Sequence, residues 1–425
     1  MTNKYCYISM SAFAMLSFAS LAVGNAILGI AALCFLSHAF KNRAALHVPD
    51  KTYYLAIGIF IGTMLISAFL SGDIKQGMKI WINAWFWRLM PFFIITLAVR
   101  EAERVKKVLI FSFAGIAMGG LCVVYQGLGG DARAAGFFGH PMTFAGYLCI
   151  YLPLLFVLLF EKSVSVRGRW FTGGLVILLS AALLFNATRG AWLAVVCTIS
   201  LLLLYYLTQR KKLAAVILCC LLAVGAGLTQ YPPVVQRAQS ITDTKNQSNH
   251  ERLLIWHSAY EMFKDHPVTG VGLGQYKDNY QKKYISPEAK EPLLAHAHNN
   301  FMQMLAENGL IGFAGFMTLI SCFIGYSFKR FWQEGNPYAL MMCASALALV
   351  LQGLTEYNFG NGAVMKSFWL VQGCLLVLSQ NWKKGEPGAG RIATKRHAGC
   401  IYEIKGNVYD FHIQKYSRHQ YDAHR

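Results

Sequence analysis

Long apolar runs alternate with short polar turns over most of the chain. The runs are about 20 residues long, which is the length a helix needs to cross the roughly 30 Å hydrocarbon core of a bilayer. The pattern predicts twelve membrane spans. Two lie within residues 6–40 and are separated near Gly24-Asn25, and the others lie at about 52–70, 81–99, 108–126, 142–160, 170–186, 190–208, 213–230, 301–327, 338–355 and 363–380.

The composition supports an all-α polytopic membrane protein. Of the 425 residues, 55% are hydrophobic and only 14% are charged, whereas a soluble domain carries roughly 25% charged residues. Disorder is excluded, and a soluble enzyme is disfavoured. We expect four regions: nine spans in residues 1–230, a long polar loop with amphipathic helices at 231–297, three spans at 298–382, and a basic, poorly ordered tail at 383–425.

The net charge of +19 is explained by topology and needs no nucleic-acid partner. Lys and Arg gather in alternate turns and in the tail, as the positive-inside rule requires of cytoplasmic segments. This frame places both termini in the cytoplasm and holds the tail near anionic membrane lipids. It places the loops at 127–141, 186–190, 231–297 and 356–362 on the opposite side, which is periplasmic at a bacterial inner membrane.

The long loop contains one clear helical pattern. Leu253, Trp256, Tyr260 and Phe263 recur at helical spacing within residues 251–264, which predicts an amphipathic helix. We expect that apolar stripe to pack on the membrane face.

Two arginines on the outer side are candidates for binding an anion. Arg189 lies between two spans, where the positive-inside rule would not put it, and Arg252 opens the helix of the long loop. The guanidinium fork matches phosphate oxygens and keeps its charge when partly buried, and a helix N-terminus would add oriented N–H groups. Alternatively, Arg189 bonds loop carbonyls and Arg252 forms a surface ion pair.

A pair of histidines stands where the long loop meets the next span. His298 is a candidate general base, because an imidazole needs little tuning to act at neutral pH. His296 is two residues away, and no carboxylate or Cys is near in the sequence, so a metal site is the less favoured interpretation. A satisfied interfacial histidine is the remaining alternative.

Three further polar residues occupy outer loops. Arg133 and His140 either line a polar site or are ordinary turn residues. Glu356, at the outer end of a span, either orients a histidine or arginine or reaches to the interface. Gly309 follows His298 by eleven residues and would allow a helix or lipid to approach closely.

At these residues the sequence resembles the O-antigen ligase family of bacterial envelope glycosyltransferases. The family pattern of a His with a polar neighbour, nine residues and Gly-x-x-Gly is met by His298-Asn299 and Gly309-Leu-Ile-Gly312. Its arginine between two spans is matched by Thr188-Arg189-Gly190. Its periplasmic arginine, followed by Pro-x-x-Gly-x-Gly, is matched by Arg252 and residues 267–272.

The resemblance implies a GT-C-like membrane transferase with no metal or nucleotide cofactor. Its donor would be a glycan on undecaprenyl diphosphate, and its acceptor a sugar hydroxyl of the lipid A core. His298 would be the base of an inverting displacement, and Arg189 and Arg252 would hold the diphosphate. Asn299, His296, Arg133, His140 and Glu356 are possible supporting residues.

Other activities use a similar constellation. A protein O-oligosaccharyltransferase moves the same donor glycan to Ser or Thr, and an O-antigen polymerase joins glycan to glycan. A transporter of lipid-linked glycan is an alternative of a different class, although such proteins tend to place polar groups near the membrane midplane and to contain inverted repeats.

Overall fold

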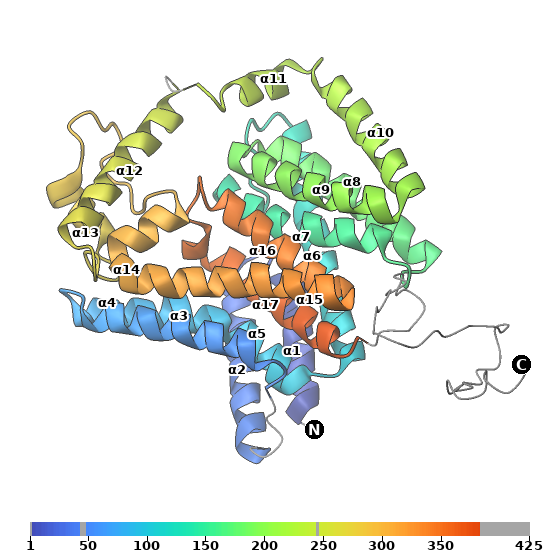
Figure 1. Ribbon diagram of the computed structural model, residues 1–425, viewed down its shortest axis with the longest axis horizontal. Coiled ribbons are helices and arrows are strands. Elements are labelled where there is room, and N and C mark those ends of the chain that lie inside the picture. Colours follow the sequence, from blue (N-terminus) through green and yellow to red (C-terminus); the bar gives the residue numbers. More distant parts are fainter. Residues whose placement is uncertain (1, 43–47, 244–245, 383–425) are drawn as a thin grey trace, which may run out of the picture. The chain divides into compact units, whose positions relative to one another are not determined.

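The computed structural model describes residues 2–42, 48–243 and 246–382. Within these ranges every regular element is a helix (Figure 1). The first half contains α1 (Thr2–Leu16), α2 (Leu21–Lys41), α3 (Lys51–Phe69), α4 (Ile74–Ile80), η2 (Trp81–Phe86), η3 (Trp87–Leu89), α5 (Met90–Ile94), η4 (Ile95–Val99), α6 (Ala102–Leu128), α7 (Pro141–Phe160), α8 (Val166–Asn186) and α9 (Arg189–Gln209).

The second half continues with α10 (Lys211–Leu228), α11 (Pro232–Gln239), α12 (Gln247–Asp265), α13 (Tyr276–Asn279), η5 (Tyr280–Tyr284), α14 (Asn300–Ile320), η6 (Ser321–Tyr326), α15 (Ser327–Glu334), α16 (Pro337–Gln352), η7 (Asn358–Gly360) and α17 (Gly362–Gln380). The expected tail at 383–425 lies outside the described residues.

This is a multi-pass membrane protein. Within the described ranges, ten helical segments are long and apolar enough to cross a bilayer. The elements α4 to η4 form one such segment, and α14 to α15 form another. The first and eleventh expected spans correspond to α1 and α16, which have 15 and 16 residues and fall below that length.

The break between the first two helices is displaced from its expected position. It lies at residues 17–20, whereas Gly24-Asn25 lies inside α2. Ser20 caps α2 by accepting a hydrogen bond from the backbone N–H of Val23, which is the usual role of serine at a helix start. Gly24 instead allows the two helices to approach, since a Cβ there would lie 3.2 Å from Ser17.

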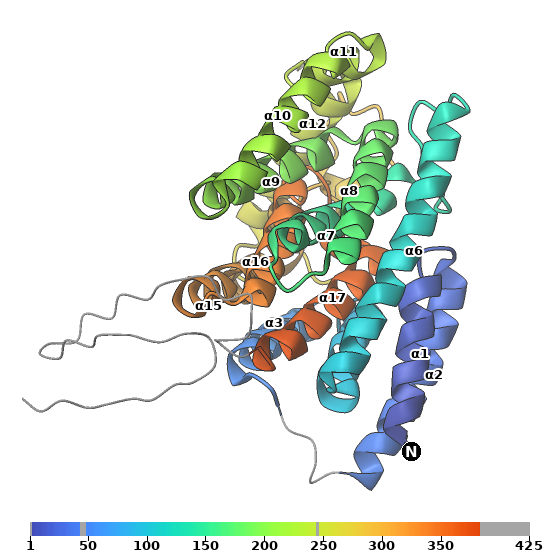
Figure 2. The same cartoon turned by 90° about the vertical axis from the view of Figure 1, so that its right-hand side faces the viewer.

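The centre of the bundle is formed by α7 and α17, which are almost completely buried, while α10 is almost completely exposed. The helices α7, α16 and α17 pack on one another, and α14 lies beside α3 (Figure 1). On another side α6 packs against α1 (Figure 2). The exposed apolar surface of α10 is what a lipid-facing helix requires.

The helix predicted in the long loop forms as α12, and the packing of its apolar stripe on the membrane face stays a prediction. α12 packs on α14 through Ile255, Ala259 and Met262, whereas Leu253 and Tyr260 are exposed. Apolar residues occur on both faces of this helix, so the hydropathy stripe alone did not single out the packed one. α12 also begins at Gln247, which puts Arg252 in its second turn and not at its N-terminus.

α14 is interrupted at Gly309, where the backbone has φ of +57° and a non-helical conformation. The loop at 267–272 docks into this break. A Cβ on Gly309 would lie 2.4 Å from the backbone of Val268, so only glycine leaves room for it. The sequence predicted a close approach here, and the approaching segment is this loop. Four backbone hydrogen bonds join the two segments: Val271 N–H to Ala306 O, Gly272 N–H to Glu307 O, Leu310 N–H to Pro267 O and Ile311 N–H to Val268 O.

The loops expected on one side of the membrane meet at one end of the bundle. Asn186 donates to the carbonyls of Ala134 and Pro141, both at 2.9 Å, and Asn299 donates to the carbonyl of Leu354 at 2.9 Å. The ends expected on the other side also meet, because one cavity is lined by residues 3, 38, 49, 100 and 380. Each of the two sets of loops therefore gathers at one end of the bundle.

Candidate active site

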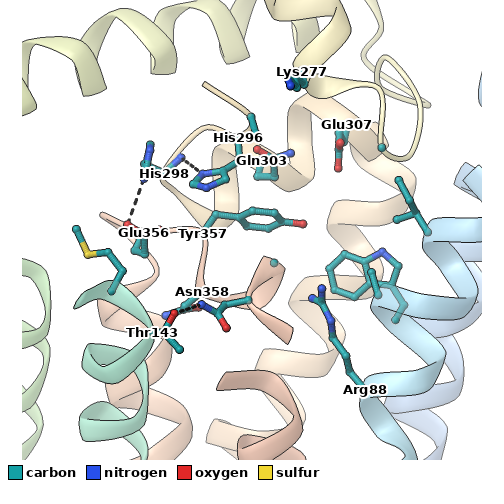
Figure 3. Close-up of a pocket in the computed structure, with 18 of the residues that line it drawn as sticks. Arg88, Thr143, Lys277, His296, His298, Gln303, Glu307, Glu356, Tyr357 and Asn358 are labelled. Atoms are coloured by element: carbon teal, nitrogen blue, oxygen red, sulfur yellow. Dashed lines mark hydrogen bonds and ion pairs between the residues drawn. The ribbon is translucent and has the colours of Figure 1, made fainter. Parts of the chain in front are cut away.

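Two cavities lie at the end of the bundle that carries the candidate residues. We call the first the large cavity. It has a volume of about 550 Å³ and is lined by His296, His298, Glu356 and residues of α4 to η3, α7 and α13 (Figure 3). The second is the arginine cavity, about 80 Å³, lined by Arg133, Arg189, Arg237 and Arg252. Glu356 and Met142 line both cavities, so the two share a wall.

His298 and Glu356 form a hydrogen-bonded pair in that shared wall. Nδ1 of His298 lies 3.2 Å from Oε2 of Glu356 (Figure 3). Burial alone would raise the pKa of the Glu356 carboxyl, but the bond from His298 and the charges of His298, His296 and Arg252 lower it. A carboxylate only accepts hydrogen bonds. Nδ1 therefore carries a proton, and in the neutral ring Nε2 has the lone pair that can accept another.

The backbone at His298 is strained. Its φ of +48° is in the left-handed region, which costs a non-glycine residue about 1–3 kcal/mol. Its N–H donates to Nδ1 of His296 at 3.3 Å, and the two rings are 4.2 Å apart. Such strain persists only where surrounding contacts over-determine it, and it is found most often at functional sites.

His296 is held neutral beside this pair. Burial, followed by the charge of His298, lowers its pKa to about 4, and Glu356 acts in the opposite direction. Since its Nδ1 accepts the bond from His298, its Nε2 carries the proton. His296 thus supports the ring of His298 without adding a second charge at neutral pH.

The same three side chains could also hold a metal ion. One ligand atom from each of His296, His298 and Glu356 lies within 4.8 Å of the other two. The sequence argument against a metal relied on the absence of a nearby carboxylate, and Glu356 supplies one from 58 residues away. In the described structure, Nδ1 of both histidines is engaged in internal hydrogen bonds, so a ligated metal would have to use Nε2 or displace them.

Arg189 lines the arginine cavity and also fastens the long loop. It is the first residue of α9, and its side chain donates to the backbone carbonyl of Ser240 and to Oδ1 of Asn249, the latter at 2.8 Å. Arg237 donates back to the carbonyl of Ala187 at 2.9 Å. The interpretation that Arg189 bonds a loop carbonyl is therefore confirmed, and its role in binding an anion stays a prediction.

The arginine cavity is strongly positive and contains unpaired polar atoms. Burial and the charges of Arg133, Arg189 and Arg252 lower the pKa of Arg237 to about 10. Burial also lowers the pKa of Arg252, although Glu356 opposes it. Among the residues the structure describes, three buried polar atoms in this wall have no hydrogen-bond partner: Thr188 Oγ1, Arg252 Nε and Gln352 Nε2. An anion would relieve the repulsion and accept the free N–H groups.

The remaining predicted residues have different environments. Arg133 lines the arginine cavity and His140 lines the large cavity. His140 also caps α7. Asn299 caps α14, where its Oδ1 accepts from the N–H groups of Phe301 and Met302, and it lines neither cavity. Arg252 donates from Nη1 to Oγ of Ser248 at 3.2 Å.

Sequence reasoning missed several residues of the site. Arg237 was not singled out because it lies on α11, a short helix with no apolar pattern of its own. Arg88, Tyr357 and Glu307 line the large cavity (Figure 3). Arg88 lies inside an expected span, and a charged residue at that depth was a signal that could have found it.

Part of this chain is similar to a known protein family and to two known proteins. Residues 174–317 match the family model described as O-Antigen ligase. A protein of Rickettsia bellii (strain RML369-C) named "Putative polysaccharide ligase" is 28% identical over 120 residues, which are 27% of this chain and 28% of that protein. A protein with a similar name from Rickettsia conorii (strain ATCC VR-613 / Malish 7) is 26% identical over 127 residues, 29% of each.

These matches are local, since the aligned part spans less than a third of each Rickettsia protein. The matched family segment nevertheless includes α9, the long loop and most of α14, so it contains Arg189, Arg252 and His298. Glu356 and Arg88 lie outside it. The matches confirm the resemblance seen in the sequence, because residues 174–317 are similar to the O-antigen ligase family model.

Proposed function

We propose that this protein is an O-antigen ligase. It transfers a glycan from undecaprenyl diphosphate to a sugar hydroxyl of the lipid A core, at the periplasmic face of the inner membrane. The observation that carries the proposal is the position of the His298–Glu356 pair in the wall between an arginine-lined cavity and a larger one. A base beside an anion site is what transfer from a lipid diphosphate requires.

The acceptor hydroxyl is activated by His298. A sugar hydroxyl is a weak nucleophile at neutral pH, so it needs a base as it attacks. Nε2 of His298 takes the hydroxyl proton while the acceptor oxygen forms a bond to the anomeric carbon of the donor. Glu356 stabilises the imidazolium that results, because its carboxylate accepts the Nδ1 proton and opposes the new charge.

The arginine cavity receives the leaving group. As the anomeric C–O bond breaks, its electron pair goes to the lipid diphosphate, and Arg252, Arg189 and Arg237 stabilise the added charge. Arg252 has an unpaired Nε–H for this purpose. The diphosphate needs no separate acid, and a single displacement inverts the anomeric configuration.

The proposed membrane orientation follows from the two ends of the bundle. The basic turns and both termini are cytoplasmic, and the loops that line the two cavities are periplasmic. In this arrangement α1 and α16 complete twelve spans, the first at the edge of the bundle and the second packed against α7. The donor and the acceptor are both lipid-anchored, which suits a site at the membrane surface.

The first experiment removes the gene from its bacterium and restores it as wild type, His298→Ala or His257→Ala. His257 is a matched control, because it lies exposed on α12. Lipopolysaccharide is resolved on a gel, lipid-linked glycan is quantified, and the membrane level of each variant is measured. We expect deletion to abolish the O-antigen ladder, wild type and His257→Ala to restore it, and His298→Ala to lower transfer at least about 1,000-fold.

Other outcomes favour the rival activities. A ladder that survives deletion while glycosylated proteins disappear indicates a protein O-oligosaccharyltransferase. A ladder reduced to a single repeat unit indicates a polymerase. If the deletion traps glycan on the cytoplasmic side and His298→Ala restores export fully, the protein is a transporter and the proposal is wrong.

A further inference from the structure

Arg88 occupies a part of the large cavity that the proposed reaction does not use. In Figure 3 it lies across the cavity from His298, with the ring of Tyr357 between them. Its Nη1 donates to the backbone carbonyl of Phe359 at 2.8 Å. The guanidinium passes over the first residue of α17, since a Cβ on Gly362 would lie 3.2 Å from its Nε.

A second cation lies behind Arg88. Lys366, one turn further along α17, is 5% exposed and donates to Oδ1 of Asn25. Arg88 and Lys366 are close enough for their charges to interact. Within the described ranges neither forms an ion pair.

A hydrogen-bond donor without a partner among the described residues lies close to Arg88. Trp85, one helical turn before Arg88, is 5% exposed, and its Nε1–H has no hydrogen-bond partner among the described residues. Trp85 and Arg88 line the large cavity and also a small cavity behind it. A buried indole N–H usually finds an acceptor, so this wall has an excess of donors as well as of positive charge.

Among the described residues, no carboxylate forms an ion pair with Arg88. The carboxylates that line the large cavity are Glu307 and Glu356. Glu356 is bonded to His298, and Glu307 accepts from the backbone N–H of Tyr276 at 3.3 Å. Uncompensated charge at membrane depth is costly and is retained for a ligand or pathway.

We infer that Arg88 is a second anion-binding point, which takes a phosphate or carboxylate carried by one of the two sugars that the enzyme joins. This inference rests on the proposed function. The Nε and Nη2 groups of Arg88 give the ligand a fork of donors, and Lys366 adds charge from behind. A sugar whose hydroxyl lies at His298 and whose anion lies at Arg88 is held at two points. This two-point contact determines which of its hydroxyls reaches Nε2 of His298.

The experiment compares wild-type enzyme in nanodiscs with R88Q. The matched control is R104Q, which removes one positive charge from an exposed ion pair with Glu101. Two acceptors are used, lipid A core with its phosphates and the same molecule after their removal. Two donors are used, one glycan with a uronic acid and one neutral glycan. Initial rates give KM and kcat for each pair.

We expect R88Q to raise KM for the anionic substrate about 10- to 100-fold, the range expected for a lost charge-assisted hydrogen bond, with a smaller change in kcat. Wild type and R88Q should have the same KM for the substrate without the anion. If the effect follows the acceptor phosphate, the anion is on the acceptor, and if it follows the uronic acid, it is on the donor. If wild type transfers glycan and R88Q matches R104Q with every pair, the inference is wrong.

A binding measurement separates this inference from the proposed activity. Glucose 6-phosphate and glucuronate are titrated against glucose while the thermal unfolding midpoint is recorded. The charged sugars should stabilise R88Q less than they stabilise wild type and R104Q, whether or not transfer occurs. If R88Q does not accumulate, R88K tests the same point, because an ammonium cannot offer the fork and should bind the charged sugars more weakly than wild type. Equal stabilisation of both proteins contradicts the inference.

Discussion

The arginine cavity and the large cavity share Glu356 but differ in how their charges are arranged. The smaller one concentrates four arginines around about 80 Å³ and holds them against mutual repulsion. The larger one has about 550 Å³, and its charged groups are spread over separate walls. A concentrated field suits a group whose charge is constant from one substrate to the next, as a diphosphate is. A roomy cavity with isolated polar groups suits a sugar, which must be oriented by contacts at several points.

Substitution of Glu356, in the wall that the two cavities share, should lower kcat the most while the enzyme still binds the donor. In Glu356→Gln the amide can donate to Nδ1 of His298, which favours the tautomer whose Nε2 carries a proton and cannot act as base. We expect kcat to fall about 100- to 1,000-fold, while affinity for the donor is retained or improved because a negative charge has left the arginine cavity.

The measurement is steady-state transfer together with binding of labelled lipid-linked glycan. Glu261→Gln, which alters a partly exposed carboxylate on α12 outside both cavities, is the control. An unchanged kcat in Glu356→Gln would show that His298 does not depend on this partner.

A substitution in the arginine cavity should change the kinetic constants for the donor and leave those for the acceptor unchanged. Arg252 is a better probe than Arg189, because Arg189 also fastens the loop to α9. We expect Arg252→Gln to lower kcat/KM for the donor about 10- to 100-fold and to leave KM for the acceptor unchanged. Lys264→Gln, an exposed cation of the same helix, should behave as wild type. A change in acceptor KM of equal size would mean that the two cavities do not bind separate substrates.

Removal of metal ions should have the smallest effect. We expect incubation with EDTA to change the transfer rate by less than about twofold, since His298 and the arginines supply base and charge stabilisation without a Lewis acid. The test is a rate before and after chelation, with metal content measured by mass spectrometry. Loss of activity that a divalent cation restores would instead assign His296, His298 and Glu356 to a metal site.

The sequence predicted the helical architecture well because lipid imposes a simple rule. A span must satisfy its own backbone and expose apolar side chains, so runs of apolar residues mark helices such as α3 and α7 within a few residues. The rule predicts less where contacts within the protein determine which face of a helix packs and where a turn lies. The packed face of α12 is set by α14, and the turn before α2 is set by the Ser20 cap.

The sequence identified candidate residues one by one, but it did not predict how they are arranged in space. His298 and the two arginines stood out because they are polar at places where topology offers no other reason for them. The partnership of His298 with Glu356 spans 58 residues and has no local signature, so the sequence left the role of Glu356 open. Arg237 belongs to the cavity through a fold of the long loop that no spacing reveals.

The break at Gly309 has a consequence for how this protein is made. It lies nine residues into α14, and the backbone groups around it are completed by the loop at 267–272. An unsatisfied backbone group in hydrocarbon costs several kcal/mol, so α14 is a poor helix to release into lipid on its own. In the proposed orientation the loop, which is synthesised first, has to cross the membrane and turn back before α14 takes its final position. Assembly of the site is thereby tied to completion of translocation, so the histidine is set against the arginines only when the exported loop has folded.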